Sequence, residues 1–268
     1  MSVVEIDVHG EVLVLTINRP EAFNALNAEV IESLRSRVVA AADDPELRAV
    51  VITGGGPKAF CAGADLKELQ DCDADQAAKI LGSGQRAFRE IELAEIPVIT
   101  AVNGLALGGG FELILAADIP VLAANARLGL PETSLGLIPG YGGTQRLPRA
   151  VGDVVATHLM LTGTKLDAHR AYALGITPIE PVDEGMATQA AIAIAERICA
   201  QGPEAVKAVL RSIDRGRDAS LDGGLQVETG LAALAVAGSE STEGIAAFLE
   251  KRPADFGTVR PSNPLGES

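Results

Sequence analysis

Alternating β-branched and polar residues open the chain and predict a β-hairpin. The runs VVEIDV and EVLVLTI form its two strands, with His9-Gly10 as the turn between them. Helical spacing then runs from Asn27 to Ala42, with Asn27 placed as the N-cap. Short apolar runs bounded by Gly, Pro or polar residues predict buried strands, and they lie at 48–54, 97–102, 118–124 and 176–182.

Strand-like runs that alternate with helical segments predict crossover connections and parallel pairing, which is typical of an α/β protein. From about Glu184 the spacing becomes helical, and we expect alanine-rich helices at 187–200, 203–215, 221–237 and 240–250. The chain is therefore expected to have three parts, which are an α/β core over 1–183, a helical region over 184–251 and a flexible tail over 252–268.

Composition and charge narrow the class of protein. The chain has 268 residues, is 47% hydrophobic and carries a formal net charge of -14. Nucleic acids and anionic membranes bind basic surfaces, so neither is expected as a partner. The N-terminal residues show no secretory signal pattern, and no apolar run is long enough for a membrane span. Three cysteines without CxxC spacing favour a reducing compartment, so we expect a cytoplasmic protein.

Several common catalytic motifs are missing from the sequence. No GxSxG or HExxH motif occurs, and the three histidines are scattered. The segment GGGPK at 54–58 lacks the spacing of a phosphate-binding loop, and LGGGFE departs from the GxGxxG pattern of dinucleotide-binding proteins. A serine hydrolase, a zinc enzyme and a nucleotide-binding enzyme are all disfavoured, and no metal site is expected.

Three glycine-rich segments lie beside residues that can do chemistry. They are 59-AFCAGADLKEL-69, the GGG segment that precedes Glu112, and 131-PETSLGLIPGYGGTQRL-147, which carries Glu132. Each feature has a structural explanation as well, since glycines permit close packing and an acid complements the start of a helix. Together, however, two carboxylates near unpaired backbone N–H groups are the components for acid–base work on a polarised carbonyl.

The chain resembles the crotonase family, and within it the enoyl-CoA hydratases. The resemblance rests on NRPEAFNALN (18–27), AFCAGADL (59–66), AVNGLALGGGFEL (101–113), LPETSLGLIPGYGGTQRL (130–147) and FLEKRP (248–253), which occur in this order and cover residues 1 to about 255. It implies an α/β fold built as a spiral of ββα units, followed by a helical C-terminal region that builds a homotrimer or a dimer of trimers.

The resemblance also implies the site. The backbone N–H groups of Ala64 and Gly109 would form an oxyanion hole for the thioester oxygen of an acyl-CoA. Glu112 and Glu132 would be the catalytic pair, and Gly140 would help to position the water. The residues implied to bind coenzyme A, which is part of the substrate, are Ala64, Asp65, Leu66, Lys67, Phe248 and Lys251. No metal or redox cofactor is implied.

The function expected from this resemblance is enoyl-CoA hydratase, as in fatty-acid β-oxidation. The alternatives are a Δ3,Δ2-enoyl-CoA isomerase, which needs only one carboxylate, and another acyl-CoA enzyme of the family. Some members of the superfamily bind RNA, but the helix expected near 75–95 is mixed to acidic. Phe111 and Leu130 depart from the commonest hydratase pattern, and we expect them to shape the acyl pocket.

Overall fold

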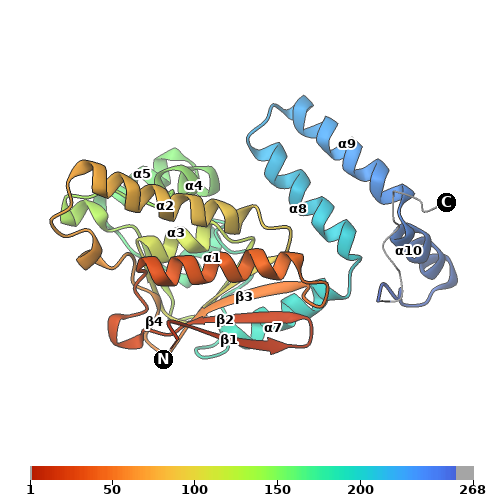
Figure 1. Ribbon diagram of the computed structural model, residues 1–268, viewed down its shortest axis with the longest axis horizontal. Coiled ribbons are helices and arrows are strands. Elements are labelled where there is room, and N and C mark those ends of the chain that lie inside the picture. The colour runs from red at the N-terminus through yellow and green to blue at the C-terminus, as the bar shows by residue number, and fades with distance from the viewer. Residues whose placement is uncertain (1, 258–268) are drawn as a thin grey trace. The chain divides into compact units, whose positions relative to one another are not determined.

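The computed structural model describes residues 2–257, which fall into two compact units (Figure 1). One unit spans Met1–Ala195 and the other Glu196–Ser268, so the division falls inside a helix, α7 (Ala187–Cys199). The boundary expected from the sequence, after residue 183, lies just before that helix. Within the described residues, no helix has both the length and the apolar character needed to cross a membrane.

The first unit repeats a strand–strand–helix pattern and alternates between two sheets. One sheet has the order β1-β2-β3-β5-β7 and the other β4-β6-β8-β9. The strands of the first sheet are β1 (Val4–His9), β2 (Val12–Ile17), β3 (Ala49–Gly54), β5 (Val98–Val102) and β7 (Ile119–Leu122). Those of the second are β4 (Ala59–Cys61), β6 (Leu105–Leu107), β8 (Arg127–Gly129) and β9 (Leu166–Asp167). This is the expected spiral of ββα units.

Pairing within the sheets follows from the connections. β1 and β2 form the predicted antiparallel hairpin, whereas β2, β3, β5 and β7 pair in parallel. Parallel neighbours need a crossover, and the helices that provide it are α1 (Ala28–Asp43), α2 (Ala74–Glu92) and α3 (Gly109–Leu115). Helices α4 (Gly143–Val151), α5 (Asp153–Thr162) and α6 (Ala168–Ala173) complete the unit.

Helix α1 shows why the sequence signals at its start were reliable. The Asn27 side chain accepts a hydrogen bond from the Val30 N–H at 2.9 Å, as expected of an N-cap. The Glu68 carboxylate adds two more contacts, at 3.1 and 3.3 Å from the Ala28 N–H. The apolar face of the helix, including Leu34 and Val38, is fully buried.

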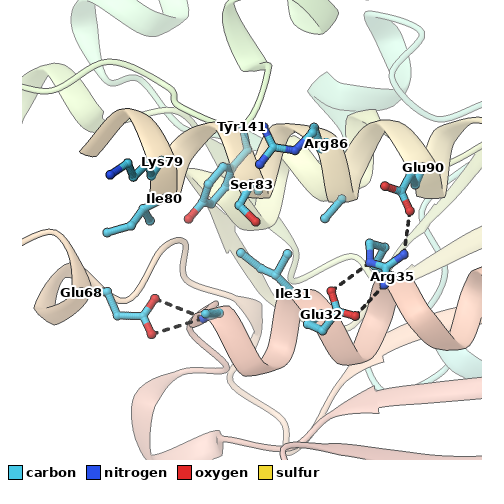
Figure 2. A pocket seen from close by; sticks show the side chains of 13 residues that line it. Ile31, Glu32, Arg35, Glu68, Lys79, Ile80, Ser83, Arg86, Glu90 and Tyr141 are labelled. Carbon is cyan, nitrogen blue, oxygen red and sulfur yellow. Dashed lines mark hydrogen bonds and ion pairs between the residues drawn. The ribbon is translucent and has the colours of Figure 1, made fainter. Parts of the chain in front are cut away.

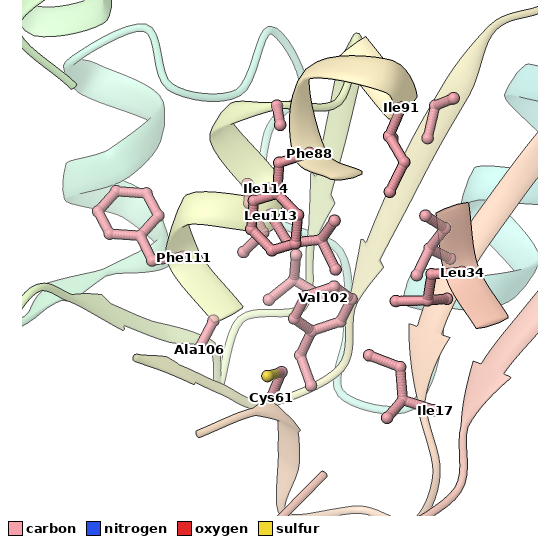
Figure 3. Close-up of a cluster of buried hydrophobic side chains, with 14 of the residues drawn as sticks. Ile17, Leu34, Cys61, Phe88, Ile91, Val102, Ala106, Phe111, Leu113 and Ile114 are labelled. Atoms are coloured by element: carbon pink, nitrogen blue, oxygen red, sulfur yellow. The ribbon is translucent and has the colours of Figure 1, made fainter. Parts of the chain in front are cut away.

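The core of the first unit lies between the sheets and their helices (Figure 3). Phe88 and Ile91 from α2 meet Leu113 and Ile114 from α3 over the β-strands. Phe111 and Leu130, which the sequence suggested as shaping the acyl pocket, are each 1% exposed and belong to this core. Both residues therefore contribute to packing.

One predicted strand is absent. The segment 176–182 makes only an isolated bridge, between Val182 and Ala123, and does not extend the sheet. Pro178 and Pro181 have no N–H to donate to a neighbouring strand. The hydroxyl of Thr177 instead donates to the Pro120 carbonyl at 2.7 Å and fixes the segment beside β7.

The second unit contains the expected helices. They are α8 (Pro203–Arg217), α9 (Leu221–Ala237) and α10 (Ser239–Glu250). The Glu240 carboxylate accepts from the N–H groups of Glu204 and Ala205 and so caps α8. Of the expected flexible tail, residues 252–257 are described and Arg252 pairs with Glu243 at 2.6 Å, whereas residues 258–268 lie outside the described part.

Candidate active site

The carboxyl ends of three short parallel strands bring the glycine-rich segments together. β4, β6 and β8 are neighbours in that order, and all three run in parallel. Parallel strands end at the same edge of a sheet. The residues that follow β4, β6 and β8 therefore share one edge, and these are the segments that begin at Gly63, Gly108 and Pro131.

Ala64 lies in the segment after β4. Its neighbours are fixed by hydrogen bonds to Leu26, whose N–H donates to Gly63 at 2.8 Å and whose carbonyl accepts from Asp65 at 2.8 Å. Between these two bonds, the Ala64 N–H donates no hydrogen bond within the described part of the chain. The segment continues into one short 3-10 turn, Leu66–Glu68, with Asp65 as its N-cap.

Gly109 begins α3, so its N–H belongs to the unpaired donors of the first helical turn. Among residues 2–257 this N–H donates no hydrogen bond. Gly63 packs against the same turn, since a Cβ at Gly63 would lie 3.6 Å from the Gly109 nitrogen. A Cβ at Gly109 would meet the side chains of Tyr141 and Leu26, at 3.0 and 3.1 Å. Two unpaired backbone donors thus lie on neighbouring segments.

Gly108 shows why this turn needs a glycine. Its backbone has φ +49° and ψ -125°, a conformation that residues with a side chain rarely adopt. A Cβ there would also lie 3.0 Å from Oε1 of Glu132. The glycine therefore lets a carboxylate from the neighbouring strand end approach the start of α3.

Glu112 is the buried charge that the GGG segment introduces. Its side chain is 1% exposed, and Oε1 accepts hydrogen bonds from the N–H groups of Tyr141 at 2.8 Å and Gly143 at 2.7 Å. Burial raises the pKa of Glu112 to about 7, the Gly143 N–H opposes the rise, and the charge of Glu132 adds to it. A carboxyl group with such a pKa can accept or donate a proton near neutral pH.

Glu132 lies at the start of the 3-10 turn Glu132–Leu135, half-buried. Burial raises the pKa of its carboxyl group as well. Its Oε2 atom is buried and has no hydrogen-bond partner in the described structure. Buried polar atoms without a partner are rare, so this oxygen is available to a bound molecule.

The loop that holds Glu112 contains residues that sequence reasoning missed. The motif GYGGTQR was considered only for Gly140, whose carbonyl accepts from Gln85 at 2.8 Å. The N–H groups that contact Glu112 belong to Tyr141 and Gly143 instead. Arg146 fixes this loop by donating to the Tyr141 carbonyl at 2.9 Å. The arginine in the motif was the signal that could have indicated this support.

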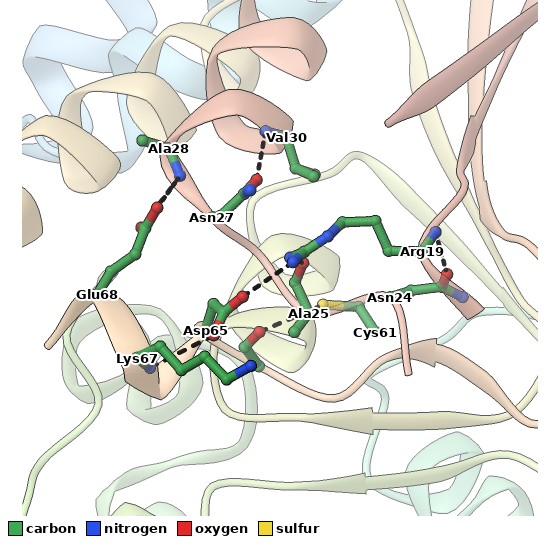
Figure 4. A network of polar contacts seen from close by, with 11 residues as sticks. Arg19, Asn24, Ala25, Asn27, Ala28, Val30, Cys61, Asp65, Lys67 and Glu68 are labelled. Atoms are coloured by element: carbon green, nitrogen blue, oxygen red, sulfur yellow. Dashed lines mark hydrogen bonds and ion pairs between the residues drawn. The ribbon is translucent and has the colours of Figure 1, made fainter. Parts of the chain in front are cut away.

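In the segment expected to bind coenzyme A, Asp65 is fixed by an ion pair (Figure 4). Asp65 pairs with Arg19 at 2.9 Å, and the Arg19 guanidinium holds the pKa of this carboxyl group below its usual range. Leu66 and Lys67 are exposed. Phe248 lies on α10 and Lys251 ends that helix, so both belong to the second unit.

Cys61 is an unreactive core residue. It ends β4, is fully buried, and burial raises the pKa of its thiol to about 12. None of the three cysteines forms a disulfide. In this environment Cys61 packs as a small apolar residue.

Comparisons with known proteins support the resemblance. Residues 7–259 match the enoyl-CoA hydratase/isomerase family. A crotonyl-CoA hydratase from Syntrophomonas wolfei is 41% identical over 243 residues, which are 91% of this chain and 93% of that protein. A short-chain-enoyl-CoA hydratase from Clostridium acetobutylicum is 39% identical, with the same coverage of 91% and 93%.

A solved structure gives the same result for the fold. The enoyl-CoA hydratase from Bacillus anthracis superimposes with a TM-score of 0.90 at 37% identity, covering 95% of this chain and 98% of that one. The spiral of ββα units, the strand ends that gather two carboxylates, and these matches over most of the chain agree. The chain belongs to the enoyl-CoA hydratase/isomerase family.

Proposed function

We propose that this protein is an enoyl-CoA hydratase, which adds water across the 2,3-double bond of a 2-enoyl-CoA thioester to give a 3-hydroxyacyl-CoA. The observation that carries the proposal is the pair of glutamates, Glu112 and Glu132, gathered near two unpaired backbone N–H groups. The relatives named crotonyl-CoA hydratase and short-chain-enoyl-CoA hydratase support the same reaction.

The proposed mechanism assigns one task to each group. Glu112 takes a proton from water as the water oxygen bonds to C3 of the substrate. The electron pair of the double bond moves toward the thioester oxygen, where the N–H groups of Ala64 and Gly109 stabilise the negative charge. Glu132 then gives a proton to C2. Removing one hydrogen-bond donor of such an oxyanion hole typically raises the activation barrier by about 3–4 kcal/mol.

Local environment supports this division of roles. With a pKa of about 7, Glu112 is ionised in a large fraction of molecules at neutral pH. Its Oε1 is occupied by two backbone N–H groups, which orient the carboxylate. Glu132 has a buried oxygen without a hydrogen-bond partner, and burial raises the pKa of its carboxyl group. Gly140 is proposed to help to position the water.

The coenzyme A portion is proposed to bind Ala64, Asp65, Leu66 and Lys67, completed by Phe248 and Lys251. Carboxylates and backbone amides supply every proton transfer and charge contact in this mechanism, so we propose that no metal or redox cofactor takes part. A homotrimer or dimer of trimers, a cytoplasmic location and a role in β-oxidation belong to the same proposal.

Lys67 gives a test of the coenzyme A site. Replacing Lys67 with Ala should raise KM for crotonyl-CoA several-fold and leave kcat nearly unchanged, because a phosphate contact is made equally in the ground and transition states. Lys58→Ala, which removes an exposed cation from the other end of β4, is the matched control and should leave KM unchanged. A loss confined to kcat would remove Lys67 from this role.

The decisive experiment separates hydration from double-bond isomerisation. Glu112→Gln and Glu132→Gln should each lower kcat for crotonyl-CoA hydration by at least about 100-fold, the usual contribution of a positioned acid or base. Both variants should also be assayed with a 3-enoyl-CoA, because an isomerase needs only one carboxylate. If either variant hydrates crotonyl-CoA like the wild type, that glutamate is not part of the mechanism and the hydratase proposal fails.

A further inference from the structure

A groove with a volume of about 840 Å³ lies between α1 and α2 (Figure 2). The side chains that line it include the apolar Ile31, Ile80 and Ala87 and the exposed Ser83. Tyr141, from the loop that holds Glu112, also lines it. The groove is therefore adjacent to the proposed active site.

Three charged side chains of the groove pair with one another. Arg35 pairs with Glu32 at 2.6 Å and with Glu90 at 2.7 Å, and this triad bridges α1 and α2 (Figure 2). A guanidinium that already holds two carboxylates has few N–H donors left for a ligand. Lys79 and Arg86 line the groove as well, and the apolar path between the helices is made by Ile31, Ile80 and Ala87.

The Tyr141 ring separates this groove from the reacting groups. Its backbone N–H contacts Glu112, and its ring lies against Gly109 on one side and Gly84 on the other. A Cβ at Gly84 would overlap the ring, at 2.6 Å from Cδ1, and a Cβ at Gly109 would lie 3.0 Å from Cδ2. Phe88 packs against the ring with centroids 5.3 Å apart. With 3% exposure, Tyr141 is almost fully buried beside these neighbours.

We propose that the Tyr141 ring closes the inner end of the groove and limits the enzyme to short 2-enoyl-CoA substrates. This inference rests on the proposed hydratase function. An acyl chain held with its thioester oxygen at Gly109 and its C3 near Glu112 meets the ring as it extends. A crotonyl group ends before the ring, and a decenoyl group would have to pass through it into the groove between α1 and α2.

The test compares chain lengths in the wild-type enzyme and in two variants. In the wild type, kcat/KM should fall by at least about 100-fold from crotonyl-CoA to 2-decenoyl-CoA, since a well-shaped pocket discriminates strongly at each methylene. Tyr141→Ala should reduce this ratio by at least about tenfold. Tyr141→Phe keeps the ring and should keep the wild-type ratio.

A second substitution tests whether the longer chain uses the groove. Ser83→Phe, added to Tyr141→Ala, should return the ratio toward the wild-type value because the new ring fills the path between the helices. An unchanged ratio in the double variant would overturn the route through the groove. If Tyr141→Ala does not fold, Tyr141→Leu, which keeps more of the buried volume, replaces it.

The experiment gives different outcomes if this inference fails and if the proposed function fails. A wild-type enzyme that hydrates crotonyl-CoA and 2-decenoyl-CoA equally well would overturn the role of Tyr141 and leave the hydratase intact. A wild-type enzyme that hydrates neither would overturn the hydratase proposal, and this inference with it.

Discussion

At the scale of the residue, Glu112 is a buried carboxyl group that must ionise in the proposed mechanism. Its carboxyl group is almost fully removed from water, and its raised pKa reflects the free energy needed to ionise it there. Two backbone N–H groups offset part of that free energy but not all of it. The same environment that suits Glu112 to catalysis therefore makes it a source of instability above its folded-state pKa.

Glu112→Gln should make the protein more stable at alkaline pH. Between the ordinary value of 4.5 and about 7, the unfolded chain has lost the proton while the folded chain keeps it. The free energy of unfolding therefore falls as pH rises through this window and stays reduced above it. At pH 8 the substitution should restore up to about 3 kcal/mol, and at pH 4 it should restore little.

Urea unfolding at both pH values measures this effect. The exposed Glu228→Gln on α9 is the control and should change the free energy of unfolding by less than about 0.5 kcal/mol at either pH. An equal effect of Glu112→Gln at pH 4 and pH 8 would contradict the ionisation argument.

The pH dependence of the hydration rate should also report the ionisation of Glu112. Because Glu112 acts in its ionised form in the proposed mechanism, kcat/KM for crotonyl-CoA should decline by about tenfold per pH unit below pH 7. Initial rates from pH 5 to pH 9 test this expectation. A profile that is flat from pH 5 to pH 8 would show that the base titrates elsewhere.

At the scale of the element, the start of α4 and the preceding loop act as a support for Glu112. Arg146 donates to the Tyr141 carbonyl and pairs with Glu92 at 2.7 Å, and Glu92 also pairs with Arg89 at 2.9 Å. Glu92 is 7% exposed, and these arginines hold the pKa of its carboxyl group below its usual range. The ion pairs thereby connect α2 to the loop that carries the two N–H donors.

Arg146→Met should loosen this support. The positive charge of Arg146 lowers the pKa of Glu112, so its removal should move the acidic limb of the pH profile to higher pH. We also expect kcat to fall by about tenfold or more, with a smaller change in KM, because the donors to Glu112 lose their position. Steady-state kinetics across pH provide both readouts.

Arg149→Met is the matched control for this experiment. Arg149 lies on the same helix, is exposed, and donates to the Gln145 carbonyl at 2.7 Å. Removing the Arg149 guanidinium should change neither kcat nor the acidic limb of the pH profile. If both variants showed the same limb as the wild type, Arg146 would have no positioning role.

The elements also explain which parts of the fold could be predicted. Strands such as β3 and long helices such as α9 carry enough periodic residues to be recognised. β6 and β8 have only three residues each, too few for any pattern, yet they arrange the site. The glycine-rich segments and the family resemblance identified Glu112 and Glu132 as candidates, but only the pairing of these strands shows why their segments meet.

At the scale of the whole molecule, apolar residues remain exposed on the C-terminal helices. In the second unit, exposed large side chains include Val209, Ile213, Leu234 and Phe248, with exposures of 57 to 82%. Helix α9 has no buried residue along its length. Exposed apolar surface of this extent is typical of a protein–protein interface.

We therefore predict that the protein assembles into oligomers through these helices. Sedimentation equilibrium at micromolar concentration should give three or six times the chain mass of 27.6 kDa. Leu234→Glu places a charge on that surface and should shift the population toward smaller species, whereas the conservative Leu234→Met should not. A wild-type monomer under these conditions would contradict the proposed trimer.

The unpaired N–H groups of Ala64 and Gly109 have a consequence for how this enzyme can change. They belong to the main chain, so a side-chain substitution scan cannot delete them and would under-report their contribution. Each of the two carboxylates, by contrast, belongs to one side chain and can be removed by a single substitution. In the proposed mechanism, the groups that stabilise negative charge are therefore fixed by the fold, whereas the groups that transfer protons can be changed by mutation. New reactions on this scaffold would arise by exchanging acids while this pair of amides is retained.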